Sequence, residues 1–68
     1  MKYAVLACIN GAYTVHAEGF TSLDKAVVNY HSYCAALWND TNPVSATVMI
    51  CDEQLDAVNG YKERIVHE

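Results

Sequence analysis

Residues 2–18 have the sequence Lys2-Tyr3-Ala4-Val5-Leu6-Ala7-Cys8-Ile9-Asn10-Gly11-Ala12-Tyr13-Thr14-Val15-His16-Ala17-Glu18. Two apolar runs flank Asn10-Gly11, which is a strong hairpin signal because a type I′ turn requires positive φ at both central residues. Pairing outward from this turn distributes the side chains over two faces. The first face carries Ala4, Leu6, Cys8, Tyr13, Val15 and Ala17, and the second carries Tyr3, Val5, Ala7, Ile9, Ala12, Thr14, His16 and Glu18. Both faces of the first strand are apolar, so each requires a covering layer.

A helical period follows the hairpin, from Ser22 to about Trp38. Its apolar side chains fall in a single arc, as in an amphipathic helix: Leu23, Ala26, Val27, Tyr30, Tyr33, Cys34, Leu37 and Trp38. Thr21 and Asp24 have the spacing of a capping box at the helix start. The turn-forming residues 39–42 and Pro43 end the helix. We expect the arc, with Tyr30, Tyr33 and Trp38 in the core, to cover the first face of the hairpin.

Residues 44–51 alternate as a third strand, in which the more apolar set should face the core: Val44, Ala46, Val48 and Ile50. A polar turn at residues 52–56 leads to a fourth strand from Ala57 to Val66. Asn59-Gly60 could form another tight turn, but a bulge or kink within this strand is preferred, because too few residues remain for a fifth well-packed strand.

The order β-β-α-β-β predicts one α+β domain over residues 1–68. Its sheet should have four antiparallel strands, with one amphipathic helix packed on one face. The first strand, apolar on both sides, suits a central position, and the spatial order 2-1-3-4 makes every neighbouring pair antiparallel.

A chain of 68 residues is near the lower limit for independent folding, yet 53% of its residues are hydrophobic. This apolar content favours a second subunit as the additional source of stability. With the helix on the first face, the second face is left for a homodimer or another protein partner. The predicted interface consists of Tyr3, Val5, Ala7, Ile9, Ala12, Thr14 and His16.

The net charge is −4, and the four basic residues are scattered along the chain, which argues against direct binding of nucleic acid. No apolar run approaches the ~20 residues of a membrane span. The apolar residues before Cys8 are too few for a signal sequence or a lipoprotein signal. We therefore expect a cytoplasmic protein that does not bind membranes.

The sequence predicts no catalytic, cofactor-binding or metal-binding residue. Three widely spaced cysteines, Cys8, Cys34 and Cys51, are typical of reduced, buried thiols. His31 and Cys34 lie one helical turn apart, but a thiol on the apolar arc should be inert. The carboxylates at residues 52–56 lack EF-hand spacing and are more typical of a solvated turn.

Two segments look like a helix end and a turn-strand element, respectively: Cys34-Ala35-Ala36-Leu37-Trp38-Asn39 and Asp52-Glu53-Gln54-Leu55-Asp56-Ala57-Val58-Asn59-Gly60-Tyr61-Lys62-Glu63. In these segments the chain resembles short uncharacterised proteins of bacterial and phage or mobile-element genomes, over about half its length. The resemblance implies no activity.

The sequence thus favours a small, acidic, non-enzymatic protein-interaction module that forms a homodimer. A further hypothesis is that it acts as an accessory or inhibitor protein of a phage or mobile element. The alternative is a small-molecule-binding or enzymatic domain that uses a thiol or histidine beside the helix or between subunits. Fast reaction of Cys34 with a thiol reagent would favour this alternative.

Overall fold

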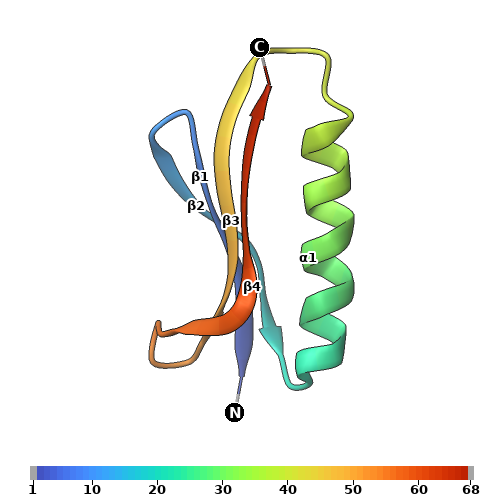
Figure 1. Cartoon of the computed structure of the whole chain (residues 1–68). Coiled ribbons are helices and arrows are strands. Elements are labelled where there is room, and N and C mark those ends of the chain that lie inside the picture. The colour runs from blue at the N-terminus through green and yellow to red at the C-terminus, as the bar shows by residue number, and fades with distance from the viewer. Residues whose placement is uncertain (1, 68) are drawn as a thin grey trace.

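The computed structural model describes residues 2–67, with only the backbone of His67 included. Its elements are β1 (Tyr3–Ile9), β2 (Ala12–Phe20), α1 (Leu23–Trp38), β3 (Val44–Asp52) and β4 (Ala57–His67). The strands form one antiparallel sheet in the order β2-β1-β3-β4, and α1 packs along one face of it (Figure 1). The predicted α+β fold, its ββαββ order and the central position of the first strand are confirmed.

The turn between β1 and β2 has the predicted backbone conformation. Asn10 and Gly11 have φ values of 51° and 88°, as a type I′ turn requires. The Asn10 amide donates to the Ser45 carbonyl at 2.7 Å, and the Ser45 amide donates to Asn10 Oδ1 at 3.0 Å. Asn10 therefore both turns the first hairpin and fixes its tip to the start of β3.

The helix begins one residue later than the sequence suggested. Its N-cap is Ser22, and within residues 2–67 no side-chain cap hydrogen bond forms at this end, so the predicted capping box of Thr21 and Asp24 is wrong. The predicted apolar arc is confirmed at its centre, where four side chains are buried: Ala26, Tyr30, Cys34 and Leu37. Trp38 does not enter the core but remains 47% exposed, and its indole N–H donates to Glu63 Oε2 at 2.6 Å.

The helix covers the opposite face of the hairpin from the one that we expected. Val5 and Ala7 are 0% and 4% exposed and belong to the same core cluster as Ala26 and Tyr30 of α1. Tyr3 and Ile9 pack against this cluster. The side chains of Leu6 and its neighbours on the first face are therefore the ones left without a covering layer.

The pairing of β1 with β3 explains this reversal. Val5 pairs with Ile50, Ala7 with Val48 and Ile9 with Ala46, so these side chains share one face. The predicted core set of β3 is confirmed, since all four of its members are buried: Val44, Ala46, Val48 and Ile50. The other face of β3 carries the more polar series Ser45, Thr47 and Met49. The apolar preference of β3 thus decides which face of β1 enters the core.

A bulge in β2 also favours burial of the Val5 face of the first hairpin. Leu6 pairs with Val15, but Val5 pairs with Ala17, so His16 is an extra residue in β2. A second irregularity follows, after which Tyr3 pairs with Phe20. Phe20 packs against the core instead of alternating out of it. Because of these shifts, a regular hairpin register gives the wrong pairing partners on β1 for the part of β2 that follows Val15.

The predicted irregularity in the last strand is confirmed. β4 is continuous from Ala57 to His67, but Met49 pairs with Lys62 whereas Cys51 pairs with Ala57. Three more residues on β4 than on β3 are accommodated between these pairs, around Gly60 with a φ of 93°. The strand bends here, as Figure 1 shows near the lower end of β4.

Replacing Ile50 with valine should reduce stability because it removes a methylene group from a side chain with no exposed surface. The expected loss in the free energy of unfolding is about 0.5–1.5 kcal/mol, measured by urea denaturation. Val28→Ala is a suitable control, since Val28 is 70% exposed and alanine favours helix. A loss of similar size in both variants would contradict the assignment of the core.

Candidate interaction surface

The face of the sheet opposite α1, here called the open face, consists of two rows of side chains. Each row crosses all four strands because paired residues of neighbouring strands share a face. The Tyr13 row contains, in sheet order, Tyr13, Cys8, Thr47 and Arg64. The Val15 row contains Val15, Leu6, Met49 and Lys62. The open face is thus apolar over β2 and β1 and basic along β4.

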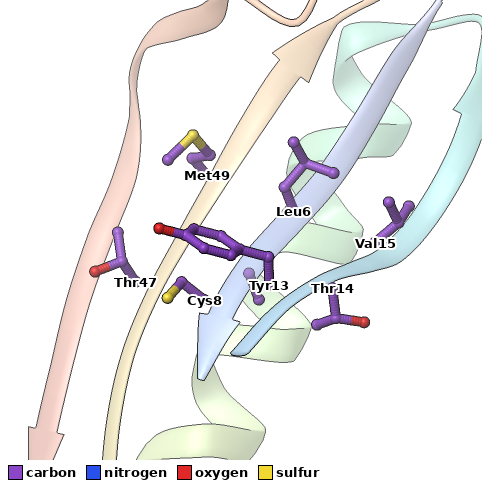
Figure 2. Close-up of a pocket in the computed structure, with 8 residues that line it drawn as sticks. Leu6, Cys8, Tyr13, Thr14, Val15, Thr47 and Met49 are labelled. Carbon is purple, nitrogen blue, oxygen red and sulfur yellow. The ribbon is translucent and has the colours of Figure 1, made fainter. Parts of the chain in front are cut away.

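A shallow groove of about 310 Å³ lies on this face between β2 and β3. It is lined mainly by Leu6, Cys8, Tyr13, Val15, Thr47 and Met49. Figure 2 shows the Tyr13 ring reaching from β2 across β1, with its hydroxyl directed toward β3. The ring therefore forms part of the surface of the sheet and does not project straight into solvent.

The open face exposes several large apolar side chains. Tyr13 is 89% exposed and Val15 is 53% exposed, while Val66 farther along β4 is 42% exposed. Leu6, Cys8 and Met49 are half-buried. Single exposed apolar residues are ordinary, but a contiguous apolar patch with a polar rim is typical of an interaction site.

The seven residues predicted as an interface do not form one surface. Val5 and Ala7 are buried beneath α1, and Tyr3 and Ile9 pack at the margin of the core. Ala12 and Thr14 remain exposed near the hairpin tip. His16 is also exposed, but its ring stacks on Tyr33 of α1, with 3.5 Å between the ring centroids and 4° between the planes. The assignment of these residues to the uncovered face is therefore corrected.

A signal for the open face was present in the sequence. The alternation of β3 defines its core face, and antiparallel pairing with β1 carries that choice to Val5 and Ala7. The first hairpin alone does not distinguish its two faces, because both faces of β1 are apolar. The bulge at His16, which removes it from its expected position opposite Val5, has no comparable signal in the sequence.

Two of the three thiols lie in environments that disfavour the nucleophilic thiolate. Burial, and next the charge of Glu63, raise the pKa of the Cys34 thiol above its usual value. Burial, followed by the charges of Asp52 and Asp56, likewise raises the pKa of Cys51. The Tyr30 hydroxyl donates a hydrogen bond to the Cys34 sulfur, which by itself acts in the opposite direction and lowers the pKa of this thiol. Cys8, in the groove of the open face, is half-buried.

The ring contact of His31 is with Tyr30, with centroids 5.1 Å apart in an edge-on arrangement. The packing of Tyr30 therefore connects His31, Cys34 and the Tyr61 ring, whose centroid is 6.1 Å from that of Tyr30. This cluster holds α1 to β4. Tyr30 and Cys34 in this cluster are each 4% exposed and belong to the hydrophobic core.

The carboxylates after β3 stabilise a turn. Asp52 Oδ1 accepts hydrogen bonds from the amides of Gln54 at 2.9 Å and Asp56 at 3.1 Å. Such local bonds from an aspartate are a common way to close a turn. No group of three or more histidine, cysteine or carboxylate side chains suited to a metal ion occurs among the described residues.

Comparison with known proteins found no relative: no family model, curated protein or solved structure matches this chain. Within residues 2–67, α1 is too short and too polar to cross a bilayer.

The three thiols should differ in reactivity in the folded protein. Cys8 should react with the aromatic disulfide DTNB at least about tenfold faster than the buried Cys34 and Cys51. The order can be read by mass spectrometry of partially labelled protein, with urea-unfolded protein as the control in which the three react alike. Fast labelling of Cys34 in the folded state would contradict the inert-core assignment.

Stability should decrease at alkaline pH because burial, with smaller effects of Cys34 and Glu63, raises the pKa of Tyr30 from 10.0 to about 12. The unfolded chain loses this phenol proton near pH 10 and the folded chain only near pH 12. The free energy of unfolding therefore falls as pH rises through this window. Urea denaturation at several pH values should show a smaller fall for Tyr30→Phe than for the wild type. An equal fall in both would show that Tyr30 does not contribute.

Proposed function

We propose that this chain is a small non-enzymatic protein-interaction module that forms a homodimer through the open face of its sheet. The observation that carries the proposal is the position of Leu6, Tyr13, Val15 and Met49 on one uncovered face. Apolar side chains gain free energy when a second surface removes them from water. A second copy of the chain can cover the open face because it presents the same apolar patch.

The size of the domain supports this interpretation. A chain of 68 residues with one helix covers only one side of its sheet. Domains of this length obtain limited stability from a single core, and association is one of the usual additional sources. An open-face homodimer would supply the second apolar layer that the chain itself lacks.

The properties of the buried thiol support a role without catalysis. A buried Cys34 with a raised pKa is largely protonated near neutrality, and a neutral thiol is a poor nucleophile. The groove on the open face carries Thr47 and Tyr13 hydroxyls and a half-buried Cys8, without an adjacent histidine or carboxylate among its lining residues. These features suit contact with another protein better than acid–base chemistry.

The proposal also includes a cytoplasmic location and no direct contact with nucleic acid. The net charge of −4 and the small number of basic residues, of which Lys62 and Arg64 lie together on β4, argue against a nucleic-acid partner. An accessory or inhibitor protein of a phage or mobile element, acting on a basic protein surface, fits the same charge.

Leu6→Glu should weaken self-association by at least about tenfold, because each dimer would bury two uncompensated carboxylates. Sedimentation equilibrium from about one to several hundred micromolar measures the effect, since weak interfaces fall in this range. Met49→Glu gives a second, independent variant on the neighbouring strand.

The matched control is Val28→Glu, which places the same charge on an exposed apolar position of α1. It should associate like the wild type. A monomeric wild type over the whole concentration range, or equal effects of Leu6→Glu and Val28→Glu, would refute the proposed function. Circular dichroism establishes that each variant is folded.

A further inference from the structure

We propose that the two copies stack with their two-fold axis parallel to the strands, so that Tyr13 of each copy covers Arg64 of the other. This inference rests on the proposed homodimer and specifies how its two open faces meet. It follows from the different chemistry of the two margins of the face. Tyr13 lies on the β2 margin and Arg64 on the β4 margin of the same row.

Aligned packing of two sheets keeps their strands within about 30° of each other. A two-fold axis between two such sheets then runs either along the strands or across them. An axis along the strands reverses the strand order, so β2 stacks on β4 of the second copy and β1 stacks on β3. An axis across the strands instead stacks each strand on its own copy.

Charge distinguishes these two arrangements. Lys62 and Arg64 both lie on β4 and both are exposed. An axis across the strands would place the two basic margins against each other, which is unfavourable for like charges in a desolvated contact. An axis along the strands places each basic margin against the apolar β2 margin of the other copy. The second arrangement avoids the repulsion.

The same arrangement matches every position of both rows. In the Tyr13 row, Arg64 meets the Tyr13 ring of the other copy and Cys8 meets Thr47. In the Val15 row, Leu6 meets Met49 and the aliphatic stem of Lys62 meets Val15. An arginine over an aromatic ring is favourable, and lysine stems commonly cover apolar surface.

The position of the Tyr13 ring suits this contact. It lies along the sheet and extends past β1 toward β3, as Figure 2 shows, and 89% of the residue is exposed. Its outer surface is therefore free to receive a guanidinium group. Within one chain, the backbones of Tyr13 and Arg64 are three strand spacings apart, roughly 14 Å.

The contact area predicts a modest affinity. Four strands about 4.8 Å apart and about seven residues long give a face of roughly 450 Å², or about 900 Å² for two copies. This area is below that of standard stable interfaces and typical of weak ones. Association in the micromolar range is therefore expected.

The test uses two variants that associate weakly alone and together restore the pairs. In a dimer of Tyr13→Arg, the arginine introduced at position 13 of each copy lies against Arg64 of the other copy. In a dimer of Arg64→Glu, the glutamate introduced at position 64 of each copy lies against the Tyr13 ring of the other. Each should self-associate on the order of tenfold more weakly than the wild type. In the mixture, the arginine introduced at position 13 of one copy meets the glutamate introduced at position 64 of the other, and the remaining Arg64 meets the remaining Tyr13. The mixture should therefore sediment with a higher average mass than either variant alone.

Tyr13→Arg mixed with Lys25→Glu is the matched control. Lys25→Glu changes the net charge by the same −2, from −4 to −6, at an exposed position on α1. A general attraction between unlike net charges would therefore act equally in both mixtures. The substituted positions Tyr13, Arg64 and Lys25 are exposed, so the variants should fold, as circular dichroism can verify.

Restored association only with Arg64→Glu supports the stacked arrangement. Because Lys25→Glu retains the open face and should associate like the wild type by itself, each mixture is compared with its two components measured separately at the same concentrations. An equal excess of association in the two mixtures, or no excess in either, overturns the arrangement. It is also overturned if Tyr13→Arg and Arg64→Glu alone associate like the wild type. In either case, sensitivity of the wild-type dimer to Leu6→Glu would leave the open-face homodimer intact with a different geometry. A wild type that remains monomeric would instead refute the proposed function itself.

Discussion

The pairing of β1 with β3 is the constraint on which the rest of the structure depends. These two central strands align Val5 with Ile50 and Ala7 with Val48, and all four side chains are almost completely buried. Because side chains alternate strictly along a strand, this single register assigns every residue of both strands to a face. The register places α1 on one side and leaves the Tyr13 and Val15 rows on the other. The candidate interaction surface is therefore a direct consequence of how the core is built.

The edge strands adapt to this central pair by means of bulges. β2 gains an extra residue at His16, which brings Ala17 opposite Val5 and allows Phe20 to pack against the core. β4 accommodates additional residues around Gly60, where positive φ permits the bend. Bulges of this kind are common at sheet edges, where they change the direction of side chains. Here they let two edge strands of imperfect pattern contribute to one core, while the regular segments near the hairpin tip remain exposed.

The sequence predicted the elements of this fold more reliably than the contacts between them. The Asn10-Gly11 turn, the helical period after Ser22 and the alternation of β3 are local signals, and the structure contains each of them. The covered face of the first hairpin is a non-local property, because both faces of β1 are apolar and only pairing with β3 distinguishes them. The bulge at His16 depends on tertiary packing and has no residue signature such as glycine. For that reason the candidate interface was assigned to the wrong face, although the expectation that one apolar face stays uncovered follows from the sequence alone.

Covering the open face would connect association with stability. The helix and sheet bury one apolar layer, whereas Leu6, Cys8 and Met49 on the other side are only half-buried. A partner that binds only the folded chain stabilises it by mass action, in proportion to the logarithm of its concentration. For a homodimer the partner is the protein itself, so folding and self-recognition draw on the same apolar side chains. Substitutions in the Tyr13 and Val15 rows would then change self-association and stability together.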